Sequence, residues 1–173
     1  EDNSIYGPYM SYGLYLSYCQ AASGNEATIA NNLISVKDYG IYMYQYNTYQ
    51  NVYYNSINVL DNNALYYHSN NDQFDSKNNI FYSASSASPA LYVYSSTGFT
   101  GNYNDLFSNY TYPVYYEGNK TFAQYQATGN GANSVNLEPV FDSDSTLVPR
   151  RLALDNLGTP ITGITDDING STR

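Results

Sequence analysis

The stretch that decides the fold is GIYMYQYNTYQNVYYNSINV, residues 40–59, which holds six tyrosines in twenty positions. The tyrosines alternate with aliphatic residues such as Ile41, Met43 and Val52 and do not recur at helical spacing. Alternation with a period of two predicts β-strands that bury one set of side chains and expose the other. The stretch therefore predicts strands that place several tyrosine rings in contact with water.

The composition restricts the class of protein and its partners. The chain has 173 residues, enough for one buried core, and it is rich in Tyr, Asn, Ser and Gly, which favours strands and turns. A formal net charge of -9 with six Lys and Arg residues makes nucleic acid and anionic membranes poor partners. No apolar run is long enough for membrane insertion. The single cysteine, Cys19, excludes an internal disulfide and a thiolate metal cluster. This composition is typical of a secreted or cell-surface protein.

Two short motifs recur in alternation along the chain. The first is Asn-x-[Ile/Leu/Val], at intervals of 23 to 29 residues; its asparagines are Asn3, Asn32, Asn55, Asn78, Asn104 and Asn133. The second is a small residue followed by an aliphatic residue and a tyrosine; its copies begin at Gly13, Gly40, Ala64, Ala90 and Pro113. Strict alternation of two motifs indicates a repeat architecture.

Each motif is long enough for one short strand, and a unit of this size must stack on its neighbours to bury an apolar face. The repeat therefore predicts an all-β protein, a parallel β-helix of about five to six coils over residues 1–141. Residues 142–173 are expected to form an irregular C-terminal tail. Equivalent residues of successive coils lie roughly 4.8 Å apart, so the motif asparagines are expected to hydrogen-bond as a structural ladder.

The repeated segments NNLISV, YNSINV and KNNIFYS resemble those of right-handed parallel β-helix proteins of the pectate-lyase-like superfamily, in particular secreted bacterial β-helix-repeat proteins. The tail is similar to the usual ending of that group, with Glu138-Pro139-Val140-Phe141, Asp155-Asn156-Leu157-Gly158 and a final word at 167–173. Because the chain opens on a ladder asparagine, Asn3, and stops at Arg173, both ends are expected to be uncapped.

Alternation within the second motif separates an inward from an outward set. The aliphatic residues are expected to point into the solenoid, so the following tyrosines point outward, one above another. We therefore predict a surface strip composed of Tyr15, Tyr42, Tyr44, Tyr66, His68, Tyr92, Tyr94 and Tyr115. One interpretation is that these rings only stabilise the strands. The other is a binding face, because exposed aromatic patches of this kind mark interaction sites.

The resemblance also raises the question of catalysis, since relatives include polysaccharide lyases with a Lys or Arg base and Ca²⁺, and hydrolases with clustered aspartates. Here Asp38 and Asp61 fall at the same place in adjacent coils, and Lys37 is the only base nearby. The alternative reading is a solvated turn, which we favour because the next coil has Ala84 and supplies no third ligand. We expect no catalytic residues, no metal and no cofactor; Ca²⁺ is the one ion that the acidic pair suggests.

The first functional hypothesis is a non-catalytic extracellular β-solenoid that acts as a structural, adhesive or self-assembling, filament-forming module. Its expected partners are a polysaccharide or other copies of the chain. The alternative hypothesis is a fragment of a carbohydrate-active enzyme, a Ca²⁺-assisted lyase or a hydrolase acting on acidic glycans, with Lys37, Asp38 and Asp61 as its candidate residues. Fold resemblance alone is weak evidence for the second hypothesis.

Overall fold

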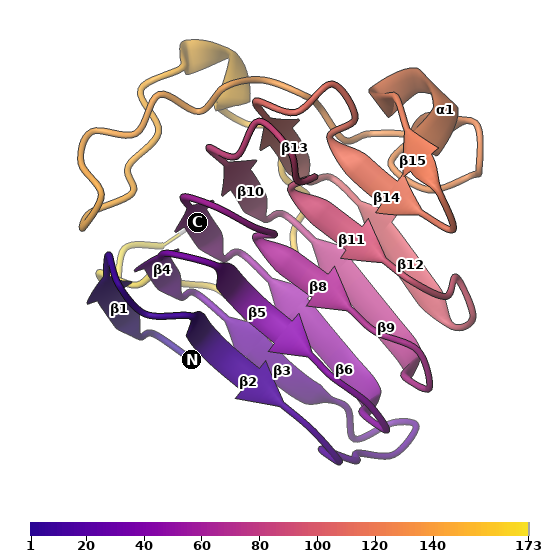
Figure 1. Ribbon diagram of the computed structural model, residues 1–173. Helices are drawn as coiled ribbons and strands as arrows, with labels where there is room; N and C mark the ends of the chain where they lie inside the picture. The colour runs from indigo at the N-terminus through magenta and orange to yellow at the C-terminus, as the bar shows by residue number, and fades with distance from the viewer. Residues whose placement is uncertain (173) are drawn as a thin grey trace.

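The computed structural model describes residues 1–172, and these form a parallel β-solenoid of about four turns (Figure 1). Strands make up 41% of the protein and helices 5%. No helix among the described residues is long and apolar enough to span a membrane. The all-β solenoid is as predicted, with about four turns where five to six coils were expected. Each coil contains a third strand in addition to the two motif strands.

Three sheets line the solenoid. Sheet A consists of β1 (Ser4–Gly7), β4 (Leu33–Val36), β7 (Ser56–Val59), β10 (Ile80–Ser83) and β13 (Asp105–Ser108). Sheet B consists of β2 (Tyr12–Leu16), β5 (Tyr39–Met43), β8 (Leu65–Tyr67), β11 (Leu91–Val93), β14 (Val114–Tyr116) and β15 (Asn119–Lys120). Sheet C consists of β3 (Ala27–Ala30), β6 (Thr48–Tyr53), β9 (Asp72–Lys77) and β12 (Phe99–Asn102).

The core is a set of aliphatic and aromatic columns that run along the solenoid axis. In sheet A the inward column is Ile5, Ile34, Ile57, Phe81 and Leu106, and in sheet B it is Leu14, Ile41, Leu65, Leu91 and Val114. From the second coil on, the members of both columns are fully buried. The register of sheet B is the one that the motif alignment predicts.

Sheet C is absent from the sequence prediction because its strands lack the period-2 hydrophobic pattern. Inward positions such as Gln50 and Ser76 are polar, yet they are buried. The outward residues Asn51, Asp75 and Thr100 are also polar. Because the buried polar residues alternate along the inward columns with apolar ones such as Val52 and Phe74, hydrophobic alternation within a single strand does not reveal sheet C.

The asparagine ladder lies at the turn from sheet C to sheet A. The side-chain amide of Asn32 donates to Oδ1 of Asn55 at 2.8 Å, and the same bond joins each neighbouring pair at 2.9 Å. The ladder consists of Asn3, Asn32, Asn55, Asn79 and Asn104, and it ends where the Asn104 N–H donates to Ser134 Oγ at 3.0 Å. The predicted positions Asn78 and Asn133 are therefore wrong by one residue.

The physical reason for this correction is the backbone at the turn. The residue before each ladder position has a left-handed conformation, with φ of 59° at Asn78 and 56° at Tyr103. Such a residue turns its side chain out of the stack, and an Asx residue tolerates this conformation well. Packing of Phe81 on Ile57 selects Asn79 for the ladder, while Asn133 donates its N–H to Asn102 Oδ1 at the C-terminal end.

The last coil is covered, contrary to the expectation of uncapped ends. The strand β15 pairs antiparallel with β14, and the helix α1 (Phe122–Gln126) buries Tyr125 completely. The N–H of Gly131 donates to the Gly101 carbonyl at 2.7 Å, and Val135 forms a β-bridge to Asp105. The C-terminal edges of all three sheets therefore already have partners, which opposes head-to-tail stacking of solenoids through this end.

The C-terminal tail runs back along the outer face of sheet A. Phe141 contacts Tyr82, and the Asn58 amide donates to Asp144 Oδ1 at 3.2 Å. Further along, Asn78 forms two hydrogen bonds with the Thr159 backbone, at 2.7 and 2.8 Å. Leu147 is the tail residue that is buried most deeply. The tail thus covers sheet A and leaves the outer face of sheet B open.

Candidate functional site

Five tyrosines from successive strands form one stacked column on the outer face of sheet B. We call this the tyrosine column; its members are Tyr15, Tyr42, Tyr66, Tyr92 and Tyr115. Successive ring centroids are 5.5, 4.7, 4.6 and 4.2 Å apart, with interplanar angles of 13°, 8°, 12° and 3°. The column forms because parallel pairing in register places the same residue of each motif at the spacing of aromatic stacking.

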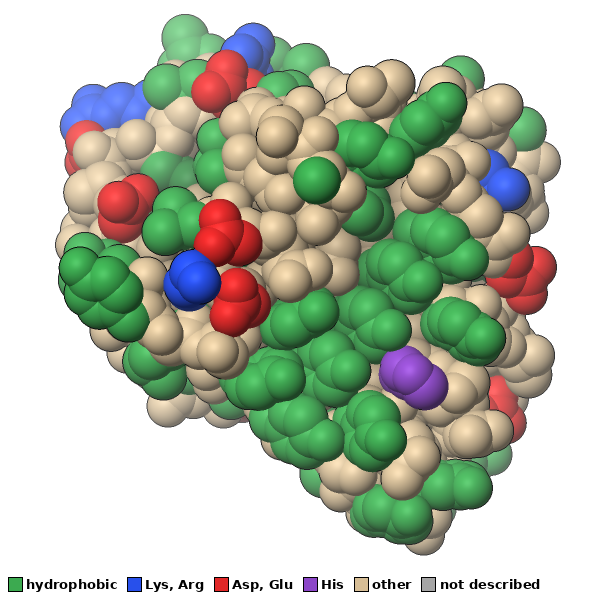
Figure 2. Space-filling view, in the orientation of Figure 1, with side chains coloured by type: hydrophobic (Ala, Val, Ile, Leu, Met, Phe, Trp, Pro, Cys, Tyr) green, Lys and Arg blue, Asp and Glu red, His purple; other side chains and the backbone are tan. Residues whose placement is uncertain are grey.

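A second, shorter row lies two residues further along the strands. Tyr44 and His68 have centroids 5.4 Å apart, and His68 stacks on Tyr94 at 5.5 Å with an interplanar angle of 7°. Nδ1 of His68 is 2.8 Å from the Ser69 hydroxyl, which holds the imidazole in place. All eight residues predicted for the surface strip therefore lie on one face. Figure 2 shows a hydrophobic band over sheet B, with the one histidine of the chain in purple.

The structure adds Tyr12 and Tyr39, which sequence reasoning missed. Their rings stack at 5.5 Å, and they meet the column edge-on, with Tyr39 at 4.8 Å from Tyr42 and Tyr12 at 5.3 Å from Tyr15. Both precede the glycine of the second motif. The sequence Tyr-Gly-[Leu/Ile]-Tyr, which occurs in the first two copies of the second motif, was the pattern that could have predicted this additional pair of rings. We call the full set of ten residues the aromatic strip.

Stacking decides which parts of the rings a partner can reach. Each inner ring of the column, such as Tyr66, has a neighbour on both faces, so that only its edge and hydroxyl face the solvent. Rings at the margins are more open, with Tyr15 and Tyr94 each 52% exposed. The strip thus presents a row of phenol edges and hydroxyls at regular spacing, with free ring surface at its margins.

The three inner phenols of the column, Tyr42, Tyr66 and Tyr92, are held in the neutral form. Burial raises the pKa of Tyr92 to about 12, with a further contribution from the neighbouring Tyr115. Burial also raises the pKa of Tyr66 and Tyr42, and the adjacent phenols act in the same direction. A charged phenolate would lose hydration and meet other phenolates, so the hydroxyls stay available as hydrogen-bond donors at neutral pH.

The candidate catalytic residues of the alternative reading lie elsewhere, at the end of sheet A. Nζ of Lys37 forms an ion pair with Asp61 Oδ2 at 3.5 Å, and both side chains are exposed to solvent. Asp38 occupies the next position after Lys37 in the same turn. Among residues 1–172 there is no group of three or more His, Cys, Asp or Glu side chains that could hold a metal ion.

A polar cluster on sheet C is a further arrangement that the sequence did not indicate. Asp75 accepts hydrogen bonds from the Tyr53 hydroxyl at 2.7 Å and the Thr100 hydroxyl at 2.8 Å, and it pairs with Lys77 at 2.6 Å. These three donors occupy both carboxylate oxygens. Asp75 is therefore arranged as a structural acceptor that joins neighbouring strands of sheet C.

Comparisons of the chain with protein-family models, with curated proteins and with solved structures find no match. The class that the geometry itself shows is the parallel β-solenoid with a tyrosine-rich surface.

Proposed function

We propose that the chain is a non-catalytic structural and adhesive β-solenoid that uses the aromatic strip on sheet B to hold a polysaccharide. The observation that carries this proposal is the unbroken stack of five tyrosines, flanked by further rings on both sides. Tyrosine combines apolar area with a hydroxyl at small entropic cost, which suits a surface built from sugar rings and hydroxyls.

The charge of the strip favours a neutral glycan. None of its ten residues is Lys or Arg, and the chain carries a net charge of -9, so a polyanionic glycan would be repelled. The resemblance of the repeated segments to secreted bacterial β-helix-repeat proteins supports an extracellular location as part of the same proposal.

Retention on insoluble neutral polysaccharides such as cellulose, chitin and starch tests this function, with pectate and alginate gels as acidic controls. The variant is Tyr66→Ala in the middle of the strip. Its matched control is Tyr9→Ala, because Tyr9 is 91% exposed and lies outside the strip. We expect Tyr66→Ala to lose retention while Tyr9→Ala behaves as the wild type. Equal retention of the two variants, or none by the wild type on any neutral glycan, would overturn the proposal.

The same strip could instead contact a second copy, since another solenoid has the same coil spacing. Sedimentation across a range of concentrations separates the two partners. A dimer that Tyr66→Ala dissociates, without glycan retention, would assign the strip to self-assembly. Electron microscopy of the same samples tests for filaments.

The alternative function is a Ca²⁺-assisted lyase or hydrolase acting on acidic glycans, for which the Lys37–Asp61 ion pair is the supporting observation. Its measurement is the release of unsaturated ends from pectate and alginate with and without Ca²⁺. Activity that disappears in Lys37→Ala and Asp61→Ala would replace the adhesive proposal.

A further inference from the structure

Asp105 is a buried carboxylate at the boundary between the solenoid and the tail. It opens β13 and points outward from sheet A, in the column that contains Ile80 in the preceding coil and Val135 in the following one. The residue is only 4% exposed because the tail covers it. Two apolar neighbours and a covering segment leave this carboxylate with little solvent.

The two oxygens of Asp105 differ in their contacts. Oδ1 accepts the N–H of Leu137 at 2.9 Å. Oδ2 is buried and has no hydrogen-bond partner among the described residues. A buried oxygen without a partner is tolerated far better in a protonated carboxyl group than in an ionised one.

The charged side chains around Asp105 all come from the tail. Arg151 lies close enough to favour the ionised form, but its Nε donates to the carbonyl of Glu138. Asp155 lines the same cavity as Asp105, and Glu138 follows Leu137 in the chain. The coils beneath contribute Ile80 and the uncharged polar side chains of Asn79 and Asn104 to the same cavity, together with the phenols of Tyr54 and Tyr103. Burial raises the pKa of Asp105 to about 7, and it outweighs the Leu137 N–H hydrogen bond and the charge of Arg151, which both lower that pKa.

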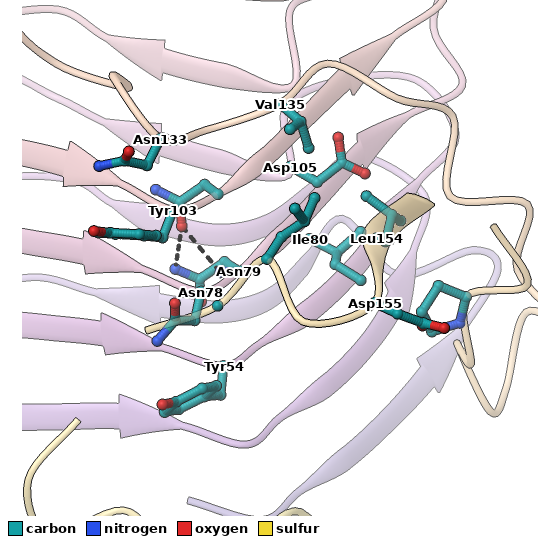
Figure 3. A pocket seen from close by; sticks show the side chains of 14 residues that line it. Tyr54, Asn78, Asn79, Ile80, Tyr103, Asp105, Asn133, Val135, Leu154 and Asp155 are labelled. Carbon is teal, nitrogen blue, oxygen red and sulfur yellow. Dashed lines mark hydrogen bonds between the residues drawn. The ribbon is translucent and has the colours of Figure 1, made fainter. Parts of the chain in front are cut away.

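The tail is packed less tightly here than the coils are. A cavity of about 200 Å³ lies between sheet A and the tail. Figure 3 shows Asp105, Leu154 and Ile80 among its lining residues. Leu152, in the short helix Leu152–Leu154, is 83% exposed. Beyond this segment, Thr159 is fastened by its two hydrogen bonds to Asn78. Loose packing next to firm anchors is typical of a segment that opens locally.

We propose that residues 137–158 form a pH-sensitive strap, which lies closed on sheet A while Asp105 is protonated and opens when Asp105 ionises. Opening exposes the carboxylate to water and frees Leu137 from it, and it also releases the buried Leu147 and the hydrogen bond from Asn58 to Asp144. The anchor at Thr159 limits the movement to this part of the tail. The device is independent of the aromatic strip, which lies on another sheet.

The direction of the pH effect follows from proton linkage. In the closed strap Asp105 has its pKa raised to about 7, whereas in the open strap it returns toward the ordinary value of 3.8. The closed form therefore binds the proton more strongly, so that opening becomes more favourable as pH rises from about 4 to about 7 and then levels off. The opening equilibrium changes by up to about tenfold per pH unit in that window.

Hydrogen exchange of the full chain, measured by mass spectrometry at about pH 5 and pH 8 and corrected for the intrinsic exchange rate, tests the strap. Peptides from residues 137–158 of the wild type are expected to exchange at least about tenfold faster at the higher pH. Peptides from β7 and β8 are expected to keep the same protection at both. In Asp105→Asn, which retains the acceptor for Leu137 without a charge, the strap is expected to stay closed at both pH values. The matched control is Asp155→Asn, an exposed carboxylate of the same cavity, which is expected to behave as the wild type.

Three results would overturn the proposal: no pH dependence in the wild type, the same dependence in Asp105→Asn, or equal changes in the coils. If Asp105→Asn fails to fold, the carboxyl carbon resonance of Asp105 in the wild type gives the answer. Its titration midpoint is expected to coincide with strap opening, and a midpoint at the ordinary value for aspartate would contradict the mechanism.

Discussion

Leu65 and Tyr66 are neighbours in β8, yet their side chains stand on opposite sides of sheet B. Leu65 is completely buried between Ile41 and Leu91, while the ring of Tyr66 stacks on Tyr92 at 4.6 Å on the outer face. One residue therefore supports the core and the other the surface. Their substitutions separate the stability of the solenoid from the function of its strip.

Leu65→Ala is expected to lower the free energy of unfolding by about 2–5 kcal/mol, because it leaves a cavity in the core. Tyr66→Ala is expected to lower it by about 1–3 kcal/mol, since it removes two stacked ring pairs but no core volume. Urea unfolding followed by circular dichroism measures both. If Tyr66→Ala is as destabilising as Leu65→Ala, the column contributes to folding as much as the core does, and its reading as a surface for a partner loses its basis.

The tyrosine column predicts a loss of stability at alkaline pH. Burial raises the pKa of Tyr92 to about 12, so its contribution is fully present below the ordinary value of 10.0 and is lost as pH rises toward 12. Tyr92→Phe keeps the ring and removes the ionising group. The fall in unfolding free energy between about pH 9 and pH 11 is therefore expected to be smaller in Tyr92→Phe than in Tyr9→Phe, whose ring is exposed. Equal falls in both variants would show that Tyr92 does not titrate in this way.

Asn78 and Asn79 are expected to respond differently to substitution. Asn79 is buried, accepts from Asn55 and donates to Asn104, so Asn79→Ala leaves buried groups unpaired and is expected to cost about 2–4 kcal/mol. Asn78→Gly fits the positive φ and removes only the hydrogen bonds to Thr159. It is expected to speed hydrogen exchange around Thr159 while the coils keep their protection. If Asn78→Gly were more destabilising than Asn79→Ala, Asn78 and not Asn79 would be the ladder residue.

The substitution Gly40→Ala is expected to destabilise the protein, even though Ala64 and Ala90 occupy the equivalent position in later copies of the motif. A Cβ at Gly40 would lie 2.2 Å from Ile57 Cγ2 and 2.6 Å from the Ala64 carbonyl oxygen. That carbonyl accepts the Ile41 N–H at 2.9 Å, so it cannot move without breaking a backbone hydrogen bond of sheet B. Gly40→Ala is therefore expected to lose about 1–3 kcal/mol by thermal melting. Gly24→Asn is the control, because nothing lies within 4 Å and asparagine tolerates its φ of +79°. A Gly40→Ala melt equal to that of the control would refute the close contact.

The sequence by itself determined the solenoid and the composition of the tyrosine column. Both follow from the alternation of side chains within each short motif. Whether a residue stands at an odd or an even position in its strand decides which face it occupies, and parallel pairing aligns equivalent positions of successive motifs. Tyr42, Tyr66 and Tyr92 could therefore be placed without a structure. The same reasoning failed at Asn78-Asn79, where two adjacent asparagines satisfy the motif equally well.

Only the tertiary structure decided the remaining features. Packing of Phe81 on Ile57 assigned Asn79 to the ladder and left Asn78 to hold the tail. The inward face of sheet C mixes apolar residues such as Phe74 with the buried polar residues Gln50 and Ser76, so its strands could be identified only from their pairing in the structure. The burial of Asp105 depends on a tail more than thirty residues away in sequence, whose position is set by contacts between segments and not by local pattern. Local periodicity specifies which way a side chain points, whereas what covers it is decided when distant segments meet.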